Sequence, residues 1–136
     1  MAMESHHAQR AIGQSVRGIA LVSDQPFSPR YDLNRVTGII TRKGHPLEGC
    51  SIKDAILVCP TAKGGVAGGW AFIDLKARGL SPLALLFDVA NPVMVQGAAG
   101  AGIPIMDSFD QPVTTIFRTG DHLAVDPTHH VVHIEQ

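Results

Sequence analysis

The sequence predicts an α/β domain in which a mixed sheet or half-barrel packs against one or two helices. The first observation is a buried strand pattern at Ile56–Cys59, followed by a glycine-rich loop and a helix pattern at Trp70–Arg78. The second is the apolar run Leu83–Phe87, which is typical of a strand covered on both faces. The third is a group of short strand patterns near both ends of the chain, which adds a β layer beside the α/β part.

The segment before the glycine loop is expected to hold two strands and two connections. Val16–Val22 is the first strand, and Val36–Thr41 is the second. The loop between them, Gln25–Arg35, is longer than a typical connection, and loops of that length often carry function. Arg42–Gly49 is expected to form a polar turn that leads back to the buried strand.

The segment after the glycine loop alternates helices and strands. In the first helix, Asp74 and Arg78 have the spacing of an i,i+4 ion pair, and Gly79 is placed as the residue that ends it. A short helix is expected at Val93–Ala101, and a short buried strand at Ile103–Met106. Strands that alternate with helices in this order indicate a small parallel sheet with right-handed crossovers.

The last segment of the chain is expected to be mostly β. Val113–Phe117 is a candidate strand, and Leu123 and Val125 alternate with less apolar neighbours. Asp126–Thr128 has the residues of a type I turn, and Val131–Ile134 follows as a further strand. These strands, together with those near the N-terminus, make up the predicted β layer.

The N-terminal segment and the uncharged middle of the chain indicate its domain organisation and whether it crosses a membrane. Met1–Gln14 is polar and has no apolar core, so we expect a flexible leader, followed by a single domain over residues 15–136. Val89–Met106 contains no charged residue, but its prolines and glycines interrupt it too often for a membrane-spanning helix. We therefore expect a cytoplasmic protein with no membrane contact.

Composition argues against a nucleic-acid-binding protein. The net charge is -1, with the signs interspersed, so the chain has no basic stripe for nucleic acid. The few aromatic residues are scattered, which argues against a base-stacking platform. The two cysteines, Cys50 and Cys59, are not in a metal-type spacing and are expected to be idle thiols.

The glycine-rich loop Pro60–Gly69 is the strongest functional signal. It contains four glycines and Lys63 just before a helix start, where backbone N–H groups carry a partial positive charge. The amides after Lys63 are therefore expected to form a concave lip that holds a carboxylate or phosphate. The competing interpretation is a packing turn, because the glycine order fits neither the dinucleotide fingerprint nor the P-loop. Trp70 and Phe72 at the helix start are expected in the core.

The remaining polar residues form no complete catalytic set. The serines lack a nucleophile-elbow context, and two of the histidines near the C-terminus would point to opposite faces of a strand rather than converge on a metal. His45 in the polar turn is retained as a candidate, as is the cluster of Arg30, Tyr31 and Asp32 in the long loop. An anion site without a visible catalytic set is expected in one half of a site shared by two chains.

The order of local motifs between residues 16 and 134 resembles one known family. It is similar to the small subunit, or swivelling domain, of the aconitase-X type hydro-lyases. The motifs that carry the resemblance are Gly18–Asp24, Phe27–Ser28, Asp32, Thr37–Ile40, His45–Leu47 with Gly49, the glycine loop and its helix, Ser81–Ala84, Gly102–Pro104, Gly120–Asp121 and Val125–Asp126.

The resemblance implies a swivelling β/β/α fold and a heterodimer with a separate large subunit. That partner would carry the iron–sulfur centre, and this chain would bind no metal. The activity in the family is dehydration of a small hydroxy acid, with cis-3-hydroxyproline and phosphomevalonate as known substrate classes. Lys63, Gly64 and Gly65 would contact the substrate anion, with His45, Asp32 and Arg30 as further cleft residues.

One departure from the family pattern concerns the reaction. Members that dehydrate have a serine after the Lys-Gly or Arg-Gly pair, and that serine takes part in proton transfer. This chain has Gly65 there, and a glycine offers an N–H group but no side chain that moves a proton. Two alternatives follow: a non-catalytic binding subunit of the same fold, or a changed reaction in which the large subunit supplies the base.

Overall fold

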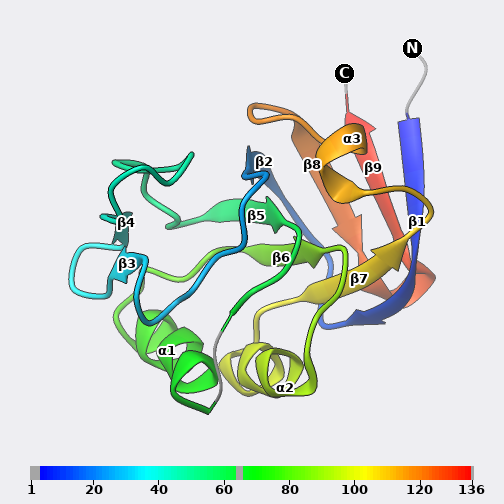
Figure 1. The fold of residues 1–136 in the computed structure, drawn as a ribbon. Coiled ribbons are helices and arrows are strands. Elements are labelled where there is room, and N and C mark those ends of the chain that lie inside the picture. Colours follow the sequence, from blue (N-terminus) through cyan, green and yellow to red (C-terminus); the bar gives the residue numbers. More distant parts are fainter. Residues whose placement is uncertain (1–3, 64–65, 136) are drawn as a thin grey trace.

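The computed structural model describes residues 4–63 and 66–135, and among these residues seven strands form a closed barrel (Figure 1). The strand order is β1-β7-β6-β5-β2-β8-β9, and β1 pairs with β9 to close the ring. The pairs β2–β5, β5–β6 and β6–β7 are parallel, and the others are antiparallel. The strands are β1 (Glu4–Ile12), β2 (Val16–Val22), β5 (Ala55–Cys59), β6 (Ala84–Phe87), β7 (Ile105–Phe109), β8 (His122–Asp126) and β9 (Val131–Glu135).

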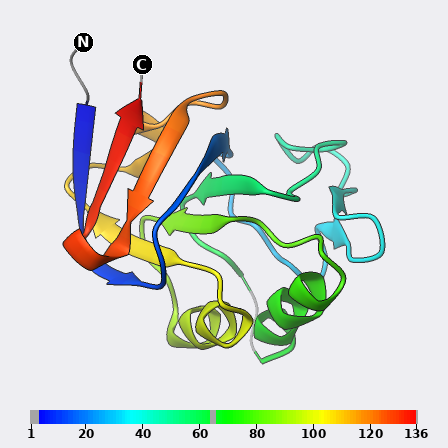
Figure 2. The same ribbon diagram turned by 180° about the vertical axis from the view of Figure 1, so that it is seen from behind.

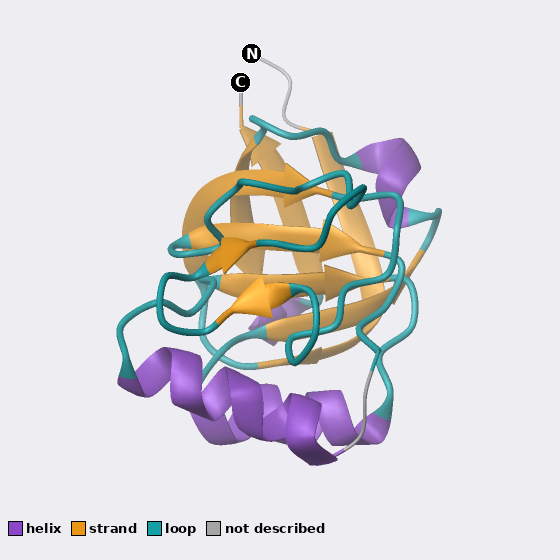
Figure 3. Cartoon of the chain, turned by 60° about the vertical axis from the view of Figure 1, so that its left-hand side comes forward, coloured by secondary structure: helices purple, strands orange, loops and turns teal. Residues whose placement is uncertain are grey.

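Helices α1 and α2 lie side by side on one flank of the barrel (Figure 3). A two-stranded sheet of β3 and β4 lies outside the barrel, within the long loops that follow β2. The remaining elements are α1 (Val66–Ala77), α2 (Pro92–Ala101), the short α3 (Val113–Ile116), the 3-10 turn η1 (Pro127–His129), β3 (Leu33–Asn34) and β4 (Ile39–Ile40). The predicted α/β class with a mixed sheet is confirmed. The sheet closes into a full barrel, whereas the prediction was a mixed sheet or half-barrel.

The prediction of a flexible leader is wrong for the residues described there. Residues 4–12 form strand β1, which pairs with β9 through its first half and with β7 through its second half. Arg10 fixes this register with two hydrogen bonds to the buried Asp107 carboxylate, at 2.7 and 2.6 Å. The inward positions include His6 and Ala8, and neither gives the branched apolar signal of a buried strand. Both termini lie at the end of the barrel away from α1 and α2 (Figure 2).

Of the predicted strands, one is confirmed only in part and another is wrong. Within Val36–Thr41, only Ile39 and Ile40 pair with β3, because Gly38 adopts a φ of 74° and donates to the Asn34 carbonyl in a turn. The candidate strand Val113–Phe117 is instead the short helix α3. Its first N–H group, on Val113, donates to the Asp88 carboxylate at 2.7 Å, which caps a helical turn.

The central parallel strands separate two apolar clusters. Ala84 and Leu86 of β6 face the cluster inside the barrel, and Leu85 and Phe87 face the cluster beneath the helices. All four side chains are fully buried, which confirms the strand covered on both faces. The barrel is therefore a packed scaffold on which the outer loops and helices rest.

The first helix agrees with its predicted features apart from one aromatic residue. Asp74 and Arg78 form the expected i,i+4 pair at 3.1 Å, and Gly79 follows the helix with a φ of 73°. Phe72 is fully buried, as predicted. Trp70 was expected in the core, but its side chain points away from the barrel and is 63% exposed. No helix in the described residues is both long and apolar enough to cross a membrane.

The two helices touch at a pair of glycines. A Cβ atom added at Gly97 of α2 would lie only 2.6 Å from the Cα atom of Gly69 on α1. The backbones therefore approach more closely than any side chain permits. Glycine at this point therefore sets the close spacing between the two helices.

Candidate functional site

A polar cleft of about 350 Å³ lies where the loops after β2, β4 and β5 meet, and we call it the basic cleft. It contains three of the predicted site residues: Asp32, His45 and Lys63. The long loop, the polar turn and the glycine-rich loop are thus brought together although they are separate in the sequence. The lining residues are Gln25, Pro26, Asp32, Arg42, Lys43, Gly44, His45, Pro46 and Lys63.

Asp32 is the buried centre of this cleft, with only 1% of its surface exposed. One carboxylate oxygen accepts the Ser28 N–H at 2.8 Å, and the other accepts Nη1 of Arg42 at 2.9 Å. Its backbone carbonyl accepts the N–H groups of Thr41 and Arg42. Burial of a charge is tolerated because it is paired and hydrogen-bonded. Asp32 therefore holds the long loop and the polar turn together rather than offering a free base.

His45 is occupied by similar structural contacts. Its Nδ1 atom accepts the Leu47 N–H at 3.1 Å, which places the proton of the neutral ring on Nε2. That nitrogen lies 3.3 Å from the Pro26 carbonyl oxygen, which accepts its proton. Both ring nitrogens are used within the chain, so His45 joins the polar turn to the loop after β2.

Lys63 reaches the cleft from the glycine-rich loop. Its backbone N–H donates to the Phe27 carbonyl at 2.7 Å, and the Phe27 N–H donates to the Thr61 carbonyl at 3.0 Å. This strand-like contact fixes the backbone of Lys63 while its side chain stays exposed. Gly64 and Gly65, predicted to form the amide lip, lie outside the described residues, and α1 begins directly after them.

Arg30 is the predicted site residue that the structure does not bring into the cleft. Its guanidinium lies 5.1 Å from the centre of the Tyr31 ring, and Tyr31 is itself 71% exposed. Arg42 and Lys43 line the cleft but were not predicted from the sequence. They lie in the turn that was predicted to be polar, but charged residues in a turn usually face solvent. Arg42 is distinguished from an ordinary charged turn residue only by its side-chain contact with Asp32.

The charges of the basic cleft suit an anion. Arg42, Lys43 and Lys63 contribute three positive charges, and Asp32 contributes one negative charge. The Glu48 carboxylate, which accepts the N–H of the lining residue Gly44 at 3.1 Å, lowers the net charge from about +2 to about +1, and this positive balance attracts carboxylate or phosphate groups into a partly enclosed space. Among the described lining residues, the carboxylate and the imidazole are already engaged in hydrogen bonds. The cleft is therefore equipped to bind a charged group rather than to move a proton.

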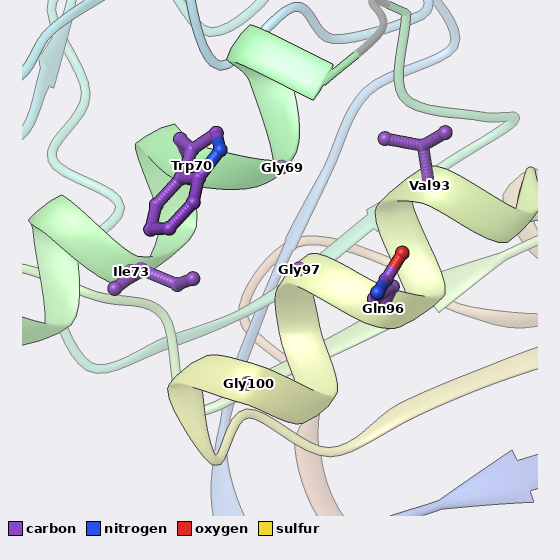
Figure 4. A pocket seen from close by; sticks show the side chains of 7 residues that line it. All are labelled: Gly69, Trp70, Ile73, Val93, Gln96, Gly97 and Gly100. Carbon is purple, nitrogen blue, oxygen red and sulfur yellow. The ribbon is translucent and has the colours of Figure 1, made fainter.

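A second hollow, between α1 and α2, has a different chemistry (Figure 4). Its volume is about 330 Å³, and Gln96 is its single polar side chain apart from the indole nitrogen of Trp70. None of the predicted site residues that the structure describes lines it. The lining residues are Gly69, Trp70, Ile73, Val93, Gln96, Gly97 and Gly100.

The described residues do not fit an iron–sulfur centre. They contain no group of three or more histidine, cysteine or acidic side chains that is arranged to hold a metal. The Cys59 thiol is fully buried and donates to the Thr61 carbonyl at 3.5 Å, and burial, with the nearby Asp88 charge, raises its pKa. A thiol that resists ionisation is a poor iron ligand. The predicted location of the cluster on a partner stays a prediction.

Comparisons with known proteins connect this architecture to a family. Over 128 residues, the chain is 34% identical to the phosphomevalonate dehydratase small subunit of Thermococcus sibiricus, covering 94% of this chain and 96% of the relative. It is 34% identical over 120 residues to the protein of the same name from Methanococcoides burtonii, covering 88% of each. Both relatives are spanned almost end to end by this chain.

Solved structures share the fold. The holo-form of Thermococcus kodakaraensis aconitase X superposes with a TM-score of 0.91 at 28% identity, covering 98% of this chain and 99% of the matched chain. A solution structure of a UPF0107 protein gives a TM-score of 0.89 at 26% identity, covering 98% of this chain and all of the other. The model of the aconitase X swivel domain matches residues 5–134, which include all of strand β1 except Glu4. The chain therefore belongs to the aconitase X swivel domain family.

Proposed function

We propose that this chain is the small subunit of a heteromeric hydro-lyase of aconitase X type, which dehydrates a small hydroxy acid that carries a carboxylate or phosphate. Family membership and the names of the relatives support the subunit class. The observation that supports the role of this chain is the basic cleft, where Lys63 stands with Arg42 and Lys43 around the buried Asp32. In this proposal the cleft binds the anionic group of the substrate.

In this proposal, the roles of the two subunits differ because the described part of the cleft has no free acid or base. Its described histidine and carboxylate are committed to structural hydrogen bonds, so this chain binds and orients the substrate. The large subunit then carries the reacting centre, including the iron–sulfur group expected for the family. Closure of this domain over the large subunit brings the cleft to that centre and excludes water from the substrate.

The test is a reconstituted complex with a candidate large subunit, assayed for dehydration of a panel of small hydroxy acids. Lys63→Ala is expected to raise KM about 10- to 100-fold, corresponding to the ~1.5–3 kcal/mol of a charged hydrogen bond. Lys53→Ala is the matched control, since Lys53 is an exposed lysine outside the cleft. Unchanged kinetics in the Lys63 variant would show that the cleft does not bind the substrate anion. Lack of dehydration with the whole panel would contradict the proposed reaction.

A second candidate function is a binding subunit of the same fold that has lost catalysis. It is favoured by Gly65, which stands where the resemblance places the proton-transferring serine. Gly65→Ser in the reconstituted complex restores a hydroxyl at that position, and Gly64→Ser places one a residue away as a control. Dehydration that begins only with the Gly65 variant would favour this candidate. Equal dehydration by the wild-type complex would exclude it.

A further inference from the structure

We propose that Arg42, held by the buried Asp32, is the second anion-binding side chain of the basic cleft and selects phosphate monoesters over monocarboxylates. This inference deepens the proposed function and rests on it for the identity of the substrate. The binding chemistry itself is argued from the contacts within this chain.

Asp32 fixes Arg42 at two points. The carboxylate accepts Nη1 of the guanidinium at 2.9 Å, and the backbone carbonyl of the same residue accepts the Arg42 N–H at 3.3 Å. The other carboxylate oxygen is tied to the Ser28 N–H, so Asp32 cannot turn away from this position. An arginine that is already ordered loses less conformational entropy when it binds a ligand.

The guanidinium keeps donors for a ligand. It carries five N–H bonds, and its contact with Asp32 uses one nitrogen, Nη1. Its side chain is 60% exposed, whereas that of Asp32 is only 2% exposed. Within residues 4–63 and 66–135, the single carboxylate within 4 Å of the guanidinium is that of Asp32. The pair therefore buries the negative charge and presents the positive charge to the cleft.

The balance of charge determines which anion suits the cleft. Three cationic side chains, the paired Asp32 carboxylate and the Glu48 carboxylate beside Gly44 leave a net charge of about +1, with the donors of all three cations in one cleft. A phosphate monoester carries about −1.5 to −2 at neutral pH and three acceptor oxygens, whereas a single carboxylate carries −1. A planar arginine fork and a lysine together match the several oxygens of a phosphate. A purely structural Arg42, present to neutralise Asp32, would show no such preference.

The experiment is an NMR titration of the full chain with inorganic phosphate and, separately, with acetate at constant ionic strength. Phosphate is expected to give saturable shifts of the amides at residues 42–45 and 61–63, and acetate to bind more weakly. Arg42→Gln is expected to raise the phosphate Kd about tenfold or more. The matched control Arg118→Gln removes the same charge from an exposed arginine that does not line the cleft.

Two further variants keep the test decisive if Arg42→Gln disturbs the polar turn. Arg42→Lys keeps the charge without the planar fork and is expected to lose part of the phosphate affinity. Asp32→Asn releases the guanidinium and also removes a negative charge from the cleft, so weaker phosphate binding by this variant would show that the ordering of Arg42 outweighs the net charge. Wild-type affinity in all three cleft variants, an equal loss in Arg118→Gln, or no saturable shift with phosphate would overturn the proposal.

The kinetics of the complex separate this inference from the proposed function. If the complex dehydrates its substrate and Arg42→Gln leaves the KM ratio of phosphorylated to unphosphorylated substrates unchanged, the inference fails and the function stands. If the complex dehydrates nothing but the chain binds phosphate through Arg42, the proposed reaction fails and the assignment of the site stands.

Discussion

Strand β5 contributes side chains to the barrel interior and leads into one of the loops of the basic cleft, but different interactions stabilise these two regions. Ile56 and Val58 of β5 point into the barrel, where they contact apolar side chains from distant strands. Residues of the cleft lie in loops that a few polar contacts hold, such as the bonds of Asp32 and His45. The interior is stabilised by many interchangeable contacts, and the cleft by a small number of specific ones.

This difference explains how the loops of the cleft can change while the barrel that supports them stays intact. Loss of one contact in the interior leaves a cavity that weakens the whole domain. Loss of one contact in the cleft releases a loop, while the ladder of strands beneath it stays paired. Changes in the interior should therefore be global in their effect, and changes in the cleft should be local.

The largest effect is expected from a cavity inside the barrel. Leu86→Ala removes a fully buried side chain and should lower the free energy of unfolding by about 2–5 kcal/mol. Urea denaturation measures this change. Val89→Ala, at a position 59% exposed, is the control and should change stability by less than about 0.5 kcal/mol. Similar losses in both variants would mean that the interior is not the source of stability.

A smaller effect is expected where helices α1 and α2 meet. Gly97→Ala forces a Cβ atom to within 2.6 Å of the Gly69 backbone and should cost about 1–3 kcal/mol. Gly100→Ala, three residues further along α2, meets only Ile73 Cδ1 at 3.5 Å and should stabilise the helix by up to about 1 kcal/mol. Thermal unfolding compares the two. A change of Tm in the same direction in both variants would contradict the close approach of α1 and α2.

A local effect is expected from the cleft. Asp32→Asn weakens the charged bond to Arg42 and, because that arginine is largely exposed, should cost only about 1 kcal/mol. Hydrogen exchange should accelerate at the amides of Ser28 and Thr41 but not at those of β5. Asp74→Asn, which weakens an exposed pair on α1, is the control for charge. Faster exchange throughout the barrel would show that the cleft and the interior are not separable.

The smallest effect is expected at a surface turn of the barrel. The hydrogen bond from the His129 ring to Asp126, at 2.7 Å, holds the pKa of Asp126 below its ordinary value. A lowered folded pKa stabilises the fold above the ordinary aspartate range, and this stabilisation is lost as the pH falls through the lowered pKa. His129→Ala should therefore raise the pKa of Asp126, as measured by carboxyl NMR titration. His7→Ala, at another exposed histidine, should leave it unchanged.

The sequence indicated the strands whose inward residues are branched and apolar. Ile56–Cys59 and Leu83–Phe87 were predicted because they are runs of apolar residues, and the structure buries most of these residues on both faces of the sheet. Strand β1 was missed because histidine and alanine fill its inward positions, and its pairing depends on strands more than 90 residues away. Closure of the barrel is therefore a long-range event that local patterns do not report.

The candidate site was predictable only in part, for a related reason. Asp32, His45 and Lys63 were chosen from three separate loops, and the fold does bring them to one cleft. Their roles in binding stay predictions. Arg42 was missed because its significance comes from a side-chain contact with Asp32, which no sequence spacing encodes. Arg30 lies outside the cleft, where its guanidinium stacks on the ring of its own neighbour Tyr31.

The exposed Trp70 gives this chain a built-in optical reporter. It is the single tryptophan of the sequence, so the indole fluorescence of the protein comes from one known position on α1, close to the glycine-rich loop. A partner that covers this part of α1 would shift the emission to shorter wavelengths, because the ring would leave water. A partner that binds at the opposite end of the barrel, near the two termini, would leave the spectrum as it is.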